Sequence, residues 1–271
     1  MSKQLDKSEV IIHKKEAIKS LNALLEKYIN SGDYSLLKKA DLIAYWFETF
    51  SNYIDFEARF DSSRLIRYSR GDVIRVNFGF NIGKEMGGLH FAVVLDNDNK
   101  QNADVITVLP LSSTDGKAVH PRSVDLGMEL FEKISSVQEN LLRNLRSEQQ
   151  EMEKINVALH STISAIEQSD GTNGTIDTQN IAHAVELQNE ILQRIYALEA
   201  TIERAENNKK EISKLKLGSM AVTNQITTIS KQRIYTPKKS EDFLYGISLS
   251  TNAMEKINAK ILELYTRKPI A

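Results

Sequence analysis

Apolar residues recur every three to four positions near the start of the chain, and this spacing predicts two helices. They lie within residues 8–60, with Ser31-Gly32-Asp33 as the break between them. The second stretch contains several aromatic residues, including Trp46 and Phe50. Large aromatic side chains are usually buried against a partner, so we expect this helix to dock on another part of the protein.

From about residue 64 the spacing between apolar positions becomes shorter than in the helical segment. Alternation over residues 71–78 predicts a strand, and apolar runs at 89–95 and 105–111 predict two more. A glycine-rich loop at 78–88 and an Asp/Asn turn at 96–99 separate them. Short strands separated by turns favour a small β-barrel over a parallel sheet with crossover helices.

A heptad pattern occupies residues 128–216 and is broken at Ser169–Gly174, which predicts two long antiparallel helices forming a coiled-coil hairpin. Residues 217–236 return to a strand pattern, and 250–265 form an amphipathic helical pattern. We therefore expect an α+β protein in which the hairpin is inserted into the barrel. The expected division is an N-terminal helical segment, an interrupted barrel with a terminal helix, and the inserted hairpin (1–63; 64–127 with 217–271; 128–216).

Charge is nearly balanced over the whole chain, with 35 Lys and Arg against 36 Asp and Glu. This balance argues against a polybasic nucleic-acid binder but leaves room for a local basic groove. The charges are unevenly distributed. The segment 128–216 has 15 acidic and 10 basic side chains, a net of -5, and the segment 217–271 has 4 acidic and 8 basic ones, a net of +4.

The chain contains no cysteine, which excludes disulfides, thiolate metal sites and cysteine nucleophiles. The histidines show no ligand spacing, so we expect neither a metal nor a cofactor. No apolar run approaches the roughly 20 residues that span a bilayer, and no secretory leader is recognisable at the N-terminus. The expected location is the cytoplasm, without membrane association.

Four ordered blocks of residues resemble the MazF/PemK family of endoribonuclease toxins. The blocks are Tyr68-x-Arg70-Gly71-Asp72-Val73-Ile74-x-Val76-x-Phe78, Gly83-Lys84-Glu85-x-Gly87-Gly88-Leu89-His90-x-Ala92-Val93-Val94-Leu95, Val108-Leu109-Pro110-Leu111-Ser112-Ser113 and Asn224-Gln225-Ile226-x-Thr228-Ile229-x-Lys231-Gln232-Arg233-Ile234. The resemblance covers roughly 64–127 and 217–265. The N-terminal helices and the hairpin fall outside it.

The resemblance implies an SH3-like barrel of the MazF/PemK/CcdB type that forms a homodimer and is inhibited by an antitoxin protein bound in its groove. It also implies cleavage of single-stranded RNA without a metal. The ribose 2′-OH would attack the adjacent phosphate and leave 2′,3′-cyclic phosphate and 5′-OH ends. Such a reaction needs a base, an acid and groups that offset the developing charge.

The resemblance also implies site residues. His90 and Ser112 are the expected catalytic residues, and the expected contacts to RNA or phosphate are Lys84, Arg70, Ser113, Asn224, Lys231 and Arg233. Three positions depart from the family pattern. His90 replaces a catalytic arginine, Asn224 replaces an acidic base present in some members, and Val222 replaces an arginine.

Other interpretations remain open at this level. His90 in an apolar strand is also typical of a structural histidine, and Ser112 and Ser113 are typical of a turn. The protein could instead be a non-catalytic binding or regulatory module that acts through the hairpin, or a toxin with a protein target such as gyrase. The hairpin could serve dimerisation, recruit a partner or cover the groove. The helices within 8–60 could also cover the groove.

Overall fold

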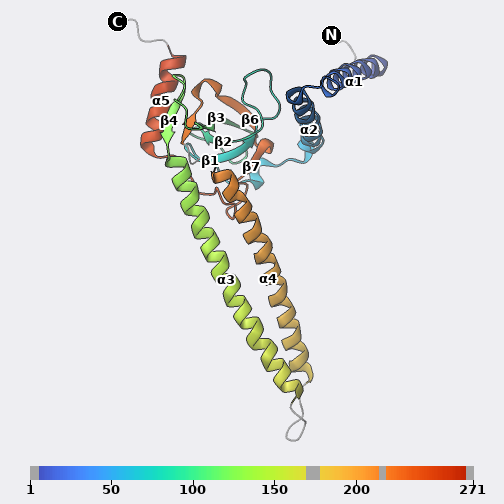
Figure 1. The fold of residues 1–271 in the computed structure, drawn as a ribbon, viewed down its shortest axis with the longest axis vertical. Helices are drawn as coiled ribbons and strands as arrows, with labels where there is room; N and C mark the ends of the chain where they lie inside the picture. Colours follow the sequence, from blue (N-terminus) through green and yellow to red (C-terminus); the bar gives the residue numbers. More distant parts are fainter. Residues whose placement is uncertain (1–5, 169–177, 214–217, 267–271) are drawn as a thin grey trace.

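The computed structural model describes residues 6–168, 178–213 and 218–266, and it combines helices with one antiparallel sheet (Figure 1). The two N-terminal helices are α1 (Lys7–Ile29) and α2 (Tyr34–Phe56). Asp6 and Asp33 cap them, each carboxylate accepting a hydrogen bond from the backbone N–H two residues later. The prediction of two helices is therefore confirmed, and the break between them lies where expected.

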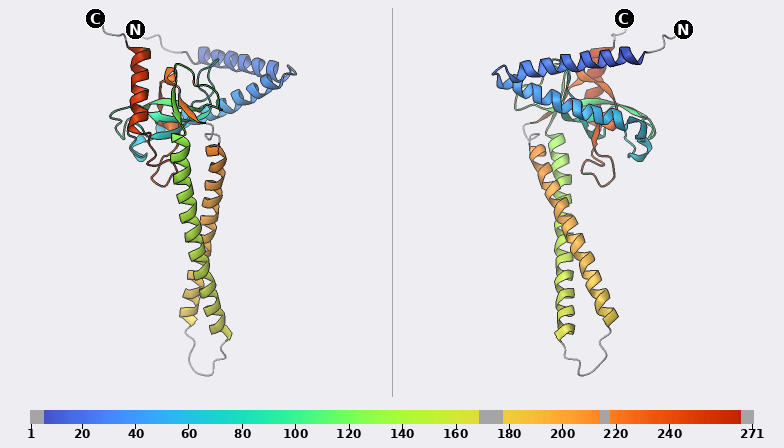
Figure 2. Two further views of the ribbon diagram at one scale, coloured as in Figure 1. Left: turned by 60° about the vertical axis from the view of Figure 1, so that its left-hand side comes forward. Right: turned by 90° about the vertical axis from the view of Figure 1, so that its right-hand side faces the viewer.

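The N-terminal helices contribute little to the core. The described part of α1 contains no buried residue, and α2 buries only Ala40 and Ile43. The two helices diverge from their connecting turn, and both lie to one side of the sheet (Figure 2). Two short 3-10 turns, Glu57–Arg59 and Ser62–Arg64, lead from α2 to the first strand.

Seven strands form the sheet: β1 (Val73–Asn77), β2 (Leu89–Val94), β3 (Val105–Ser113), β4 (Val124–Gly127), β5 (Ser219–Ala221), β6 (Thr227–Ser230) and β7 (Ile234–Thr236). Their order is β4-β5-β3-β2-β1-β7, and β6 pairs with the first half of β3. Within the described residues no ladder joins β6 to β7, so the sheet is not closed. The expectation of a mixed helix-and-sheet fold is confirmed, while the SH3-like barrel stays a prediction.

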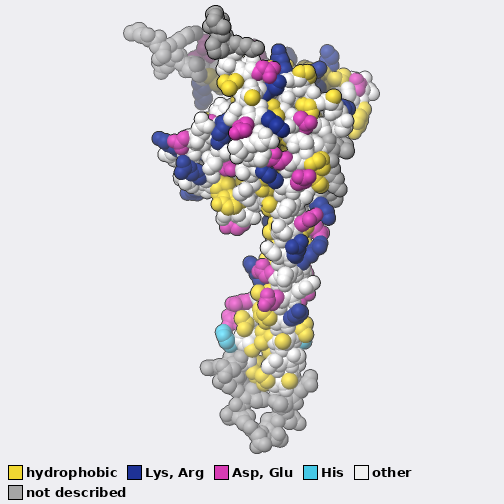
Figure 3. Space-filling view, turned by 90° about the vertical axis from the view of Figure 1, so that its left-hand side faces the viewer, with side chains coloured by type: hydrophobic (Ala, Val, Ile, Leu, Met, Phe, Trp, Pro, Cys, Tyr) yellow, Lys and Arg dark blue, Asp and Glu magenta, His cyan; other side chains and the backbone are white. Residues whose placement is uncertain are grey.

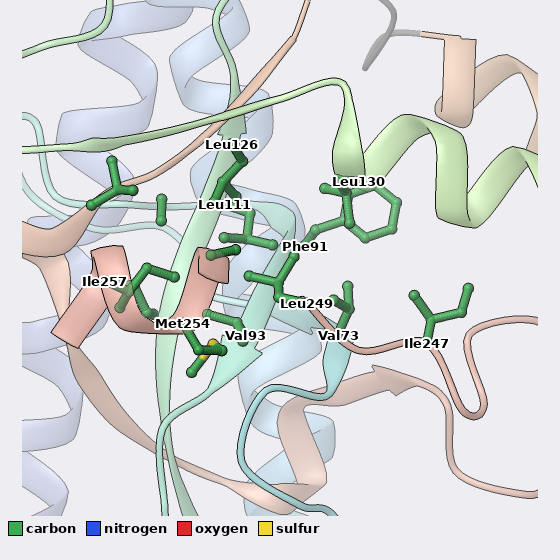
Figure 4. Close-up of a cluster of buried hydrophobic side chains, with 14 of the residues drawn as sticks. Val73, Phe91, Val93, Leu111, Leu126, Leu130, Ile247, Leu249, Met254 and Ile257 are labelled. Atoms are coloured by element: carbon green, nitrogen blue, oxygen red, sulfur yellow. The ribbon is translucent and has the colours of Figure 1, made fainter. Parts of the chain in front are cut away.

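Alternation along the strands sends side chains into two cores on the two faces of the sheet. One core contains Ile74 and Val76 of β1 with Ile106 and Val108 of β3. The other lies between the sheet and the helices α3 (Glu129–Gln168) and α5 (Thr251–Tyr265), and Figure 4 shows its labelled members: Val73, Phe91, Val93, Leu111, Leu126, Leu130, Ile247, Leu249, Met254 and Ile257.

The helices α3 and α4 (Thr178–Ser213) form an arm that projects away from the sheet (Figure 1). The strands on either side of the arm, β4 and β5, pair with each other, so the arm starts and ends at neighbouring positions in the sheet. Its base belongs to the second core, where Leu130, Ile134 and Ile212 are buried. The predicted break at 169–174 lies outside the described residues.

Ion pairs join the two helices of the arm: Arg146 with Glu206 and Arg194 with Glu148. Towards the far end, hydrophobic side chains gather on the surface (Figure 3), and the exposed ones include Ile155, Val157, Ile166, Val185 and Leu187. Among the described helices, none has both the length and the apolar character needed to cross a membrane.

Candidate functional site

A cavity of about 640 Å³ opens between the glycine-rich loop and the segment that follows β5. The loop side contributes Phe78 and Lys84, and the opposite side contributes Asn224 and Arg233. Three residues predicted to contact RNA, far apart in sequence, therefore line one cavity. A larger hollow of about 970 Å³ lies between the arm helices, but the resemblance points to none of its residues.

Gln225 holds the loop side of this cavity in place. Its Oε1 accepts a hydrogen bond from the Met86 backbone N–H at 2.5 Å, and its Nε2 donates to the Lys84 carbonyl oxygen at 2.9 Å. The loop is also closed at its neck, where the Gly88 N–H donates to the Gly79 carbonyl oxygen at 2.6 Å. A side chain at Gly87 would meet that same oxygen at 2.9 Å, so the neck requires glycine there. Lys84 thus sits on a braced loop.

Arg233 forms the opposite wall. Its Nε donates to the Asn77 carbonyl oxygen at 2.9 Å, and its guanidinium carbon lies 5.5 Å from the centroid of the Trp46 ring. Burial lowers the pKa of Arg233, and the nearby Tyr53 acts in the other direction. An arginine remains charged under these conditions, so Arg233 brings a positive charge to the cavity.

His90 and Ser112 lie together at the adjoining ends of two strands. Strands β2 and β3 pair with Phe91 opposite Leu111. His90 and Ser112 each lie one residue beyond that pair, at the same end and on the same face of the sheet. Both side chains are half-buried. They are not among the residues that line the cavity, but His90 follows closely on Met86, which does line it.

The surroundings of His90 favour its neutral form. Burial lowers the pKa of His90, a hydrogen bond with the Gly87 backbone acts in the opposite direction, and the nearby charge of Arg75 lowers the pKa further. A neutral imidazole that donates one N–H to a carbonyl keeps its other nitrogen free to accept a proton. His90 therefore has the protonation state that a general base requires.

Arg75 was not among the predicted site residues. It is 8% exposed, and its guanidinium carbon lies 5.4 Å from the Phe91 ring centroid and 5.6 Å from that of Tyr235. Arg75 pairs with Phe91 and Val76 pairs with His90, so the side chain of Arg75 points to the face of the sheet opposite His90. An arginine within an alternating strand could have drawn attention as a buried charge. Gln225 and Trp46 were also missed as site residues, because both act through contacts with distant segments.

Arg70 and Ser113 are engaged elsewhere. Arg70 donates to the Leu95 carbonyl oxygen and to Oδ1 of Asn258, which ties the end of β2 to α5. The Ser113 hydroxyl donates to Asp115 at 2.8 Å within the turn after β3. These two predicted RNA contacts are thus bound to the protein's own groups and lie outside the residues that line the cavity.

Lys231 is turned into the protein. Its side chain is 0% exposed, and its Nζ donates to the carbonyl oxygens of Lys100 and Gln101 at 2.9 and 3.1 Å. Burial lowers the pKa of Lys231, and the charges of Asp104 and Asp96 partly offset that effect. Lys231 therefore stabilises the loop before β3, and the structure gives no support to the prediction that it contacts RNA.

The cavity is lined by amide groups, the ammonium group of Lys84, the guanidinium of Arg233 and the carboxylate of Glu85. Among the described residues, no group of three histidine, aspartate or glutamate side chains is arranged to hold a metal ion. The arrangement suits a negatively charged ligand, which Lys84 and Arg233 can approach from opposite walls. His90 lies outside this lining, and its imidazole can accept or donate a proton.

Comparison with known proteins agrees with this picture. Residues 69–169 match the family of PemK-like, MazF-like toxins of type II toxin-antitoxin systems. The matched range contains β1 to β4, His90 and Ser112, and it continues into α3. The match confirms the family resemblance for this segment, whereas Asn224 and Arg233 lie outside the matched range. No curated protein matches the chain significantly.

Proposed function

We propose that this chain, which carries a PemK-like, MazF-like toxin segment at 69–169, is a toxin-like endoribonuclease. It cleaves single-stranded RNA without a metal and leaves 2′,3′-cyclic phosphate and 5′-OH ends. The observation that carries the proposal is that Lys84 and Arg233 line one cavity, and that His90 lies four residues beyond Met86 of the same lining. The same match does not favour a non-catalytic module or a toxin directed at a protein target.

The reaction begins at His90 in this proposal. Its neutral imidazole accepts the proton of the ribose 2′-OH, and the 2′-oxygen forms a bond to the adjacent phosphorus. The bond between phosphorus and the 5′-oxygen breaks, and the leaving oxygen takes a proton from solvent. Because the attacking group is part of the RNA, the step uses no metal-activated water and no cofactor.

The other site residues act on charge and position. Lys84 and Arg233 offset the negative charge that grows on the phosphate oxygens. In this proposal the Ser112 hydroxyl exchanges its 3.4 Å hydrogen bond to the Ser113 carbonyl oxygen for one to the phosphate. Asn224 offers an amide but cannot transfer a proton. Burial keeps His90 neutral in this proposal, and the charge of Arg75 adds to that effect by disfavouring the imidazolium.

The proposed organisation follows the sequence expectation. The barrel consists of residues 64–127 and 217–271. The inserted hairpin is residues 128–216, and the N-terminal helical segment is residues 1–63. A type II toxin has an antitoxin partner, and we propose that an antitoxin binds this protein and that two copies form a dimer in the cytoplasm. The protein's own helices are a second source of regulation.

The test is a cleavage assay. Purified protein, freed of any co-purifying inhibitor, is incubated with long single-stranded RNA in EDTA, and the new ends are analysed. We expect 5′-OH ends with wild type, none with His90→Ala and few with Ser112→Ala. His160→Ala is the matched control, because His160 is exposed on the distant arm. Intact RNA under every condition would refute the proposal.

A further inference from the structure

Trp46 of α2 lies directly on the base of the glycine-rich loop. A Cβ atom added to Gly79 would lie 2.5, 2.6 and 2.7 Å from three ring carbons of Trp46. The indole therefore occupies the space that any larger residue at position 79 would need. The contact brings a helix from outside the matched range 69–169 against the loop that carries Lys84.

The same indole also lies against Arg233, which lines the cavity, although Trp46 itself is not among the lining residues. It lies 5.5 Å from the Arg233 guanidinium, which also donates to the Asn77 carbonyl oxygen. Tyr53, one heptad further along α2, contacts Trp46 with its ring centroid 6.3 Å away. Arg233, which is predicted to bind phosphate, thus packs one face of its guanidinium against the indole and donates from one edge to a carbonyl oxygen. Trp46 therefore joins the base of the loop to Arg233, since it contacts Gly79 on one side and the guanidinium on the other.

The attachment of α2 is local, and the helix remains tethered. Phe47 and Phe50, on the same face as Ile43, are each 45% exposed, so few side chains hold the helix down. The chain beyond α2 is fixed, because Gln101 Nε2 donates to the Ser63 and Leu65 carbonyl oxygens at 2.9 and 2.7 Å. A helix anchored in this way can leave the cavity and return at a high effective concentration.

The geometry points to α2 as a built-in cover of the RNA site. With Trp46 seated on Gly79 and Arg233, the helix holds the guanidinium against its indole, which limits how closely Arg233 can approach a phosphate, and it restrains the loop that carries Lys84. When α2 lifts, the arginine becomes available to single-stranded RNA. This inference deepens the proposed ribonuclease function and rests on it. It assigns the covering role to α2 rather than to the arm.

The experiment uses the full chain and four proteins: wild type, Trp46→Ala, Trp46→Phe and Tyr45→Ala. Tyr45 is an aromatic neighbour that is 68% exposed, so it is the matched control. The first measurement is the rate at which phenylglyoxal modifies Arg233, followed by mass spectrometry. The second is RNA cleavage in EDTA. Trp46→Phe keeps an aromatic ring and guards against a folding defect, which circular dichroism would reveal.

We expect Trp46→Ala to accelerate both Arg233 modification and cleavage. A cation–π contact of about 0.5–2 kcal/mol corresponds to about a 2- to 30-fold change. Trp46→Phe should fall between, and Tyr45→Ala should match wild type. If the modification rate of Arg233 is unchanged in Trp46→Ala, the proposal that α2 covers the site is overturned. Faster modification with slower cleavage would also overturn it, because Trp46 would then serve RNA binding. Faster modification with no cleavage by any protein would support the cover and refute the ribonuclease.

Discussion

Gln225 gives the sharpest prediction, because one side chain bridges two backbone groups of the cavity loop. Replacing it with alanine removes both hydrogen bonds. Each is worth about 0.5–1.5 kcal/mol net, so the loop should lose about 1–3 kcal/mol of local stability. Since about 1.4 kcal/mol is a factor of ten, the loop should open about 5 to 150 times more often.

Hydrogen exchange at the Met86 amide measures that opening, because this N–H donates to Gln225 Oε1. Gln225→Glu is the matched control. Its carboxylate keeps an acceptor for the Met86 N–H but loses the donor to the Lys84 carbonyl. We therefore expect Met86 to stay protected in Gln225→Glu and to exchange faster in Gln225→Ala. Exchange within twofold of wild type in Gln225→Ala would show that the side chain does not brace the loop.

Three further predictions concern catalysis, the arm and the cover. In a pH–rate profile, the cleavage rate should be constant above the pKa of His90 and should fall as the pH drops below that pKa. The midpoint of the fall should lie under the ordinary histidine value of about 6.5. Ile134→Ala should cost about 2–5 kcal/mol in urea denaturation, because this side chain is 0% exposed at the base of the arm. Gly79→Ala should displace Trp46 and shift the emission of the chain's single tryptophan to the red, whereas Gly83→Ala should not.

The comparison of the two glycines is controlled for backbone strain. Gly79 and Gly83 have φ of +77° and +66°, so alanine is disfavoured at both, but only Gly79 faces Trp46. Equal emission in the two variants would contradict the contact. A midpoint at or above that of an ordinary histidine would remove His90 from the role of base. A loss under about 1 kcal/mol for Ile134→Ala would mean that the arm is not part of the core.

Periodicity made most of the elements predictable. Three-to-four spacing marked the helices at both ends of the chain, and alternation marked β1, because these patterns report which face of each element is buried. The sequence blocks also proposed His90, Ser112, Lys84 and Arg233 as site residues, and two of these, Lys84 and Arg233, line one cavity. The aromatic character of α2 predicted that it docks, and its contact with Gly79 confirms this.

The contact partners of individual charged side chains were not predictable from the sequence. Lys231 and Arg233 are two residues apart in one short 3-10 turn, so they point to different sides of the chain. Lys231 enters the protein and binds backbone carbonyls, while Arg233 faces the cavity. Arg70 joins β2 to α5 in the same unforeseen way. Sequence shows that such residues carry charge, but not which carbonyl or ring lies beside them.

The sequence by itself therefore determined the elements, the family resemblance and the residue types available for chemistry, because each of these is encoded locally. Only the tertiary structure decided which of those residues meet. The lowered pKa of His90 depends on its burial in the folded protein. The hydrogen bonds of Gln225 to the loop and the contact of Trp46 with Gly79 join segments that are far apart in the chain. Their contacts arise from how the strands pair and how α2 returns to the sheet, and no local pattern records that.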